Sequence, residues 1–277
     1  MKFVNPKNDV AFKKIFGNEQ KKEILISFLN AVLDLTGERE IADLEILNPY
    51  QAPTIEVIKT TLLDVRARDK RGVSFIVEMQ VENVSALNKR FLYYTAKMYA
   101  AQIERGEDYP KLNQVIFIGV LDFVAFATDA YLSRHLILDA ETRAHELRDL
   151  EFNFIELPKF KKGESELATL LDKWIYFIKQ AGDLSVIPES THETGLRAAY
   201  EVANQFSWTR DELDIYDQRG IRLQDERGAV QLAQQEGRQA RSREIARAML
   251  AEGLDRALIM KLTGLSAAEL VALTNDA

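Results

Sequence analysis

The sequence predicts an α/β protein in which a mixed β-sheet is flanked by helices and followed by a helical C-terminal region. Apolar residues recur at helical spacing as far as Leu35, and β-branched and aromatic residues then dominate to about residue 157. From Gly163 onward no convincing strand pattern remains. The 277 residues, 47% of them hydrophobic, suffice for one large core with a helical extension or for two domains.

Two helices are expected to open the chain. Asn8 or Asp9 caps the first, which ends at Gly17, and the second occupies residues 19–35. The segments that follow are expected to form strands over 41–47, 57–69, 73–81 and 114–123, a crossover helix over 86–105, and two short strands at the sheet edge over 135–138 and 152–157.

The second half of the chain reads as helices over residues 164–181, 192–205 and 210–252. Because the last of these carries three glycines, we expect two helices there. The polar cluster around Pro188 marks a boundary, so we predict a core over 1–185 and a helical region over 186–277.

Two short helices joined by Gly264 are expected to close the chain, with Ser266 and Glu269 forming a capping box. A helix-turn-helix that contacts DNA is one interpretation. Residues 267–273 contain no Arg, Lys, Asn or Gln to reach base edges, which favours a packing or oligomerisation unit.

Composition excludes several classes of site. The chain has no cysteine, which removes disulfides, iron–sulfur clusters and thiol chemistry, and it has no phosphate-binding loop or nucleophile elbow. No apolar run approaches the roughly 20 residues of a membrane span, so we expect a cytoplasmic protein without a membrane partner. The formal net charge of −7 argues against indiscriminate coating of nucleic acid, but acidic proteins can still bind DNA through one basic face.

The segment from Leu62 to Val81 carries the most information. Its odd-numbered strand positions are apolar and its even-numbered positions are mostly polar, so one face is core. Residues 70–72 suit a three-residue hairpin loop that ends in a left-handed glycine. That loop pairs Asp69 with Val73 and therefore sets Asp64 opposite Glu78.

Two facing carboxylates, with about 4.5 to 5.5 Å between their Cβ atoms, repel each other and require compensation. A divalent cation such as Mg²⁺ compensates them, because it binds one or two carboxylates and keeps water and phosphate as its other ligands. The alternative is a solvated polar face on which Arg66, Arg68 and the lysines neutralise the acids. Spacing alone leaves both interpretations open.

Asp64 followed after fourteen residues by Glu78-Met79-Gln80 resembles the D…(D/E)xK core of the PD-(D/E)xK nucleases. In particular it resembles the recombination-promoting nuclease (Rpn) and transposase family, whose third position is usually Gln. Further segments agree with that family along most of the chain: residues 8–17, 27–33, 89–94, 245–254 and 262–266.

The resemblance implies a restriction-endonuclease-like sheet and a Mg²⁺-dependent DNA endonuclease, with Mn²⁺ or Ca²⁺ as other ions for the site. Asp64 and Glu78 would be catalytic metal ligands, and the backbone carbonyl of Met79 would complete the site. Gln80 would take the place of the catalytic lysine, although an amide supplies no charge. Either a nearby cation replaces that lysine or catalysis is weak.

Four accessory residues complete the expected site. Arg90, Tyr94 and Lys97 fall on one face of the crossover helix, where the alternative is an exposed helix stripe. Asp9 is an accessory acid or a helix cap. The expected partners are DNA and a second copy of the chain through the C-terminal helices. The rival functions are a catalytically weak or inactive DNA-binding or assembly protein, and hydrolysis of phosphoesters in RNA or small nucleotides.

Overall fold

The computed structural model describes residues 2–47, 50–51, 61–62, 64–84, 86–104 and 106–275. The chain forms two compact units, Met1–Tyr216 and Asp217–Ala277. The sequence placed a boundary at residue 185. The compact unit extends beyond it because α5 (Thr194–Ala203) packs against α1 (Asp9–Phe16) and α2 (Lys22–Leu33).

A mixed six-stranded sheet forms the centre of the first unit, in the order β1-β4-β5-β6-β8-β7. Strands β5, β6 and β8 are parallel to one another, and the other pairs in this sheet are antiparallel. Its strands are β1 (Leu44–Leu47), β4 (Val65–Asp69), β5 (Ser74–Gln80), β6 (Val115–Leu121), β7 (Leu132–Leu136) and β8 (Leu150–Glu156). A separate antiparallel pair joins β2 (Tyr50–Gln51) to β3 (Thr61–Leu62). Most of the strand expected over 57–69 before Thr61 lies outside the described residues.

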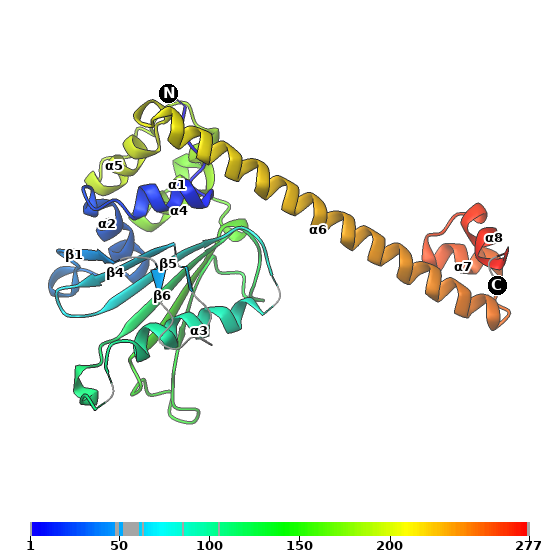
Figure 1. The fold of residues 1–277 in the computed structure, drawn as a ribbon, viewed down its shortest axis with the longest axis horizontal. Helices are drawn as coiled ribbons and strands as arrows, with labels where there is room; N and C mark the ends of the chain where they lie inside the picture. The colour runs from blue at the N-terminus through cyan, green and yellow to red at the C-terminus, as the bar shows by residue number, and fades with distance from the viewer. Residues whose placement is uncertain are drawn as a thin grey trace. The chain divides into compact units, whose positions relative to one another are not determined.

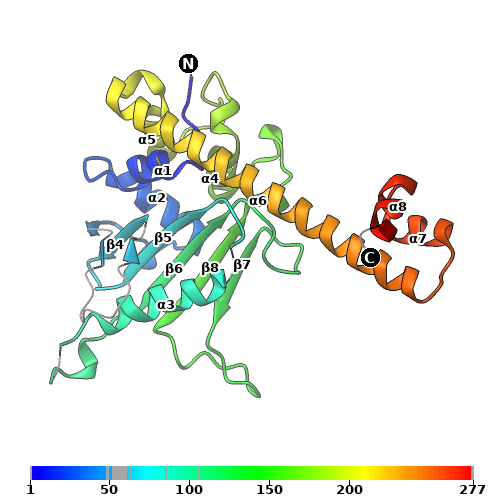
Figure 2. The ribbon, with the colours of Figure 1, turned by 45° about the vertical axis from the view of Figure 1, so that its right-hand side comes forward.

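Helices cover both faces of the sheet, which makes the fold an α/β sandwich of the predicted class (Figures 1 and 2). Helices α1, α2, α4 (Leu170–Gln180) and α5 lie on one side and enclose the larger core, which includes Phe28, Phe75 and Trp174. Helix α3 (Leu87–Ala100) lies on the other side and encloses a smaller core around Phe91 and Phe117. As expected, α3 connects two parallel strands, β5 and β6.

The face of β5 expected to be polar is buried beneath α3. Ile76 belongs to the smaller core, and Ser74 and Glu78 on the same face are also buried. The alternation of side chains predicted the two faces correctly but could not show that a helix covers the second one. Any chemistry of Glu78 therefore takes place in a partly desolvated setting.

Strand β7 lies at the sheet edge as expected, whereas the edge position expected for β8 is wrong. Strand β8 lies between β6 and β7. The acidic residues Glu151 and Glu156 make β8 resemble an exposed edge strand in the sequence. In the structure both are buried and ion-paired, Glu151 to Arg134 and Glu156 to Lys159. Paired acids are tolerated in an interior strand because their charges are compensated.

The second unit comprises most of α6 (Arg210–Ala251), together with α7 (Arg256–Thr263) and α8 (Ala267–Asn275). The expected break within residues 210–252 is wrong, since α6 is one continuous 42-residue helix. Each interior glycine costs about 1 kcal/mol of helix stability but blocks no backbone hydrogen bond, unlike proline. Ala246, Ile259 and Leu270 form the small core that joins the end of α6 to α7 and α8.

None of the helices in the described ranges has both the length and the apolar character needed to cross a bilayer.

Gly195 of α5 allows close approach to α2. A Cβ atom at this position would lie 2.5 Å from both the carbonyl oxygen of Glu23 and Cβ of Ser27. We expect Gly195→Ala to lower the free energy of unfolding by roughly 1 to 2 kcal/mol, because overpacking outweighs the gain in helix propensity. Urea denaturation followed by circular dichroism measures the change.

Gly220 of α6 is the matched control, because nothing lies within 4 Å of a Cβ atom there. Gly220→Ala should stabilise the helix by about 0.5 to 1 kcal/mol. Equal effects of the two substitutions would contradict the close packing of α5 on α2.

Candidate metal centre

The hairpin between β4 and β5 has the register that the sequence predicted. Val65 pairs with Val77 and Arg68 with Ser74, and the Gly72 N–H donates to the carbonyl of Asp69 at 3.0 Å. Gly72 adopts the left-handed conformation, with φ of 88°, that closes the three-residue loop. Continuing this register by one residue sets Asp64 opposite Glu78.

The two carboxylates differ in their hydrogen bonding. Oδ2 of Asp64 accepts the backbone N–H of Met79 at 2.8 Å, which ties the residue before β4 to β5. Glu78 is 6% exposed, and its Oε2 atom is buried without a hydrogen-bond partner in the described structure. A buried carboxylate oxygen without a donor is costly unless a proton or cation binds it.

Two cations approach the pair from opposite faces of the sheet. Nζ of Lys13 on α1 lies 3.3 Å from Oδ1 of Asp64. A guanidinium nitrogen of Arg90 on α3 lies 3.7 Å from Oε1 of Glu78. Arg90 also donates to the hydroxyl of Tyr94 at 3.1 Å, which orients the guanidinium toward Glu78.

Burial and mutual repulsion shift the ionisation of both acids. Burial and the charge of Asp64 raise the pKa of Glu78 from 4.5 to about 8, against the lowering effects of Arg90 and Lys13. Burial also raises the pKa of Asp64, while the Met79 N–H and Lys13 oppose that rise. Near neutral pH and without a metal, the pair therefore shares less than two negative charges.

The remaining predicted site residues are Asp9, Gln80 and Lys97. Asp9 is the first residue of α1, whose N-cap is Asn8, and its charge contributes to the raised pKa of Asp64. The amide of Gln80 at the end of β5 donates to the carbonyl of Glu82 at 3.1 Å. Lys97 is half-buried about two turns along α3 from Arg90.

Lys13 was not selected from the sequence as a site residue. Its spacing of four residues from Asp9 places both side chains on one face of α1. The sequence could show this shared face, but it could not show that the face meets Asp64, because that contact depends on how α1 packs on the sheet.

The residues present fit a weakly held divalent cation. Two facing carboxylates, one with an unpartnered buried oxygen, match the one or two acidic ligands that Mg²⁺ takes while it keeps water and phosphate. Within the described ranges, no three His, Cys, Asp or Glu side chains gather into a metal-binding group. The donor set thus suits an ion that leaves several positions for water and substrate, rather than an enclosed structural site.

The raised pKa of Glu78 predicts how stability depends on pH in metal-free buffer. Between about pH 5 and about pH 8, the carboxyl group of Glu78 is ionised in the unfolded chain but still largely protonated in the folded protein. The free energy of unfolding should therefore fall as pH rises through this range. The total decrease in the free energy of unfolding should be on the order of a few kcal/mol, as expected for a pKa shift of this size. Below about pH 4 Glu78 is protonated in both states and should add no pH dependence.

Glu78→Gln should flatten that slope, because glutamine has no proton to release. Urea denaturation across the same pH range in EDTA measures the effect, with Glu45→Gln on β1, an exposed acid, as the control. An unchanged slope in Glu78→Gln would contradict the raised pKa.

Comparison with known families agrees with this geometry. Residues 6–233 match the model of the PD-(D/E)XK nuclease family transposases. Residues 239–275 match the C-terminal HTH domain of the Rpn/YhgA-like nuclease family. Searches of curated proteins and of solved structures return no match. The match over residues 6–233 covers most of the sequence, and the chain therefore belongs to the PD-(D/E)XK nuclease family transposases.

Proposed function

We propose that this protein is a metal-dependent DNA endonuclease of the recombination-promoting, transposase-associated type, which hydrolyses phosphodiester bonds. The observation that carries the proposal is the buried, facing pair of Asp64 and Glu78, with its unpartnered carboxylate oxygen, in a chain of this nuclease family. Mg²⁺ is the ion we propose for the pair, with Mn²⁺ and Ca²⁺ as alternatives, and the backbone carbonyl of Met79 as a further ligand.

Each residue of the site has a separate role in the proposed reaction. A cation bound by Asp64 and Glu78 would supply Lewis acidity and a water of lowered pKa. Lys13 and Arg90 add positive charge from two sides, which attracts a phosphodiester and stabilises the charge that develops on its oxygens. Gln80 orients water or phosphate through its amide, and Asp9, Tyr94 and Lys97 shape the surroundings.

Lys13 supplies the charge that the third position of the family pattern lacks in this chain. Gln80 carries no charge, whereas Nζ of Lys13 lies 3.3 Å from a proposed metal ligand. A cation placed there from a helix serves the same electrostatic purpose as a strand lysine, provided that its ammonium reaches the bound phosphate. We therefore propose Lys13 as a catalytic residue.

The HTH domain supports DNA as the partner of the second unit. The last helix of this domain, α8, presents Val271 to solvent, and α7 presents Leu258 and Leu262. These apolar side chains suit contact between two copies of the chain better than contact with base edges. We propose that the domain brings DNA and a second copy together, and that the protein acts in the cytoplasm.

A second candidate function is a DNA-binding or assembly protein with weak or no catalysis on a nuclease scaffold. The observation that favours it is Gln80, because its amide is uncharged and already donates to the carbonyl of Glu82. The two candidates make opposite predictions for cleavage.

Asp64→Ala and Glu78→Ala should each lower metal-dependent nicking of supercoiled plasmid by about 100-fold or more, since each removes a proposed ligand of the ion. Glu45→Gln should cleave like the unmodified protein. DNA binding in Ca²⁺ should persist in all three variants, as measured by fluorescence anisotropy. Equal nicking by the unmodified protein and both alanine variants would assign the activity to another site, and no nicking by any of them would favour the binding function.

Lys13→Met should lower cleavage by roughly 10²-fold, as loss of one charge-stabilising donor does in other enzymes. Gln80→Lys should keep or raise cleavage in the unmodified background and should restore part of it in Lys13→Met, because it returns a cation to the same strand. Lys21→Met, which removes a half-buried lysine paired with Glu201, is the control. Lys13→Met with full activity would remove Lys13 from the site.

A further inference from the structure

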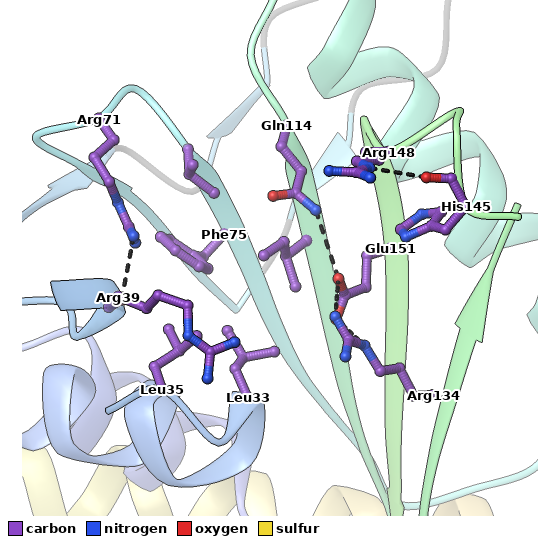
Figure 3. Close-up of a pocket in the computed structure, with 12 residues that line it drawn as sticks. Leu33, Leu35, Arg39, Arg71, Phe75, Gln114, Arg134, His145, Arg148 and Glu151 are labelled. Atoms are coloured by element: carbon purple, nitrogen blue, oxygen red, sulfur yellow. Dashed lines mark hydrogen bonds and ion pairs between the residues drawn. The ribbon is translucent and has the colours of Figure 1, made fainter. Parts of the chain in front are cut away.

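A second concave site lies at the other end of the sheet from the carboxylate pair. Its cavity of about 350 Å³ opens near the starts of β5, β6 and β8 (Figure 3). Phe75 and Ile116 line it from the face that packs on the larger core, whereas Glu78 belongs to the opposite face of β5. The cavity is therefore separate from the proposed metal centre.

Four arginines surround this cavity, although the chain as a whole has a formal net charge of −7. They come from four separate segments: Arg39, Arg71, Arg134 and Arg148. Figure 3 shows Arg39 and Arg71 on one side of the cavity and Arg134 and Arg148 on the other. Guanidinium groups that converge from separate segments create a local excess of positive charge.

Two of these arginines are held in place by buried acids. Arg134 binds both carboxylate oxygens of Glu151 at 2.8 Å, and Arg71 binds Oδ2 of Asp69 at 2.6 and 2.8 Å. The side chains of both acids are 2% exposed. These pairs form a fixed frame for the cavity, and their charges are largely compensated.

The other two arginines retain their charge for a ligand. In the described part of the chain, neither Arg39 nor Arg148 has an acidic partner within ion-pair distance; Arg148 donates only to the backbone carbonyl of His145 at 2.8 Å. The ring of His145 also lines the cavity, and its Nε2 atom is buried without a hydrogen-bond partner in the described structure. Two uncompensated guanidinium groups and a buried imidazole nitrogen favour an anionic ligand with several acceptor atoms.

The floor of the cavity is apolar and includes Leu33, Leu35 and Val73 beside Phe75 and Ile116. Inorganic phosphate would leave this floor uncovered, and an apolar ligand would leave the arginines without a partner. The volume lies near the lower end of the roughly 300 to 1,000 Å³ that is usual for small-molecule sites.

We propose that this cavity binds a nucleoside 5′-phosphate. Arg39 and Arg148 hold the phosphate, for which a guanidinium fork is well suited, and the base lies on the apolar floor, where arginine planes can also stack on it. The ligand is a free nucleotide or the 5′-phosphorylated end of a DNA strand, because the two share this chemistry. The proposal does not depend on catalysis at Asp64 and Glu78.

Isothermal titration calorimetry of the full chain in EDTA and at fixed salt tests this site. Deoxyadenosine 5′-monophosphate should bind at least tenfold more tightly than either deoxyadenosine or inorganic phosphate. Arg39→Gln and Arg148→Gln should each weaken binding about tenfold, since each removes a charge-assisted contact to phosphate. Arg197→Gln, an exposed arginine on α5, and Glu78→Ala should leave binding unchanged.

Short oligonucleotides separate the two sources of the ligand. A 5′-phosphorylated strand that binds more tightly than the mononucleotide, and loses this advantage in Arg148→Gln, identifies the DNA end as the source. Binding of the mononucleotide alone identifies a free nucleotide. Binding of inorganic phosphate as tight as that of the nucleotide, or binding unaffected by both arginine substitutions, would overturn the proposal.

Discussion

The repulsion between Asp64 and Glu78 is the constraint on which the rest of the candidate metal centre depends. The hairpin register sets these carboxylates opposite each other, and hydrophobic packing holds that register. Val65, Val77 and Met79 belong to the larger core, and Ile76 belongs to the smaller one. A slip of β5 by one residue would move these apolar side chains out of their own cores and turn polar residues such as Ser74 and Glu78 toward the larger core, so the acids cannot move apart without disruption of the packing.

The presence of helices on both faces of the sheet explains how cations reach both acids. Because α1 and α3 lie on opposite sides of the sheet, Lys13 approaches Asp64 from one side and Arg90 approaches Glu78 from the other. Each cation compensates one carboxylate only partly, since the pKa of both acids stays raised. The raised pKa values show that burial and repulsion outweigh these ion pairs. The two carboxylates can therefore bind a further positive charge.

The sequence was sufficient for the parts of the fold that depend on local pattern. The loop of Lys70, Arg71 and Gly72 and the alternation around it fixed the hairpin, and the opposition of Asp64 and Glu78 follows from them. The burial of β8 could not be predicted, because Glu151 is compensated by Arg134 from another strand, β7, although Glu156 pairs with Lys159 only three residues further along the chain. The place of Lys13 in the site depends on helix packing in the same way. The contacts of Arg134 with Glu151 and of Lys13 with Asp64 join separate segments, and the pattern of side chains within one segment cannot predict them.

The source of the positive charge also links the proposed chemistry to the packing of the first helix. A lysine at position 80 would be held by the strand that carries Glu78, whereas Lys13 is held by α1, which the larger core anchors through Phe12, Ile15 and Phe16. These three side chains are buried, so the ammonium group stays near Asp64 only while that core is intact. Changes in the core under α1 can therefore alter the electrostatics of the site without touching either acid. In the proposed mechanism, the packing of a helix positions the cation that a strand residue supplies in the general family pattern.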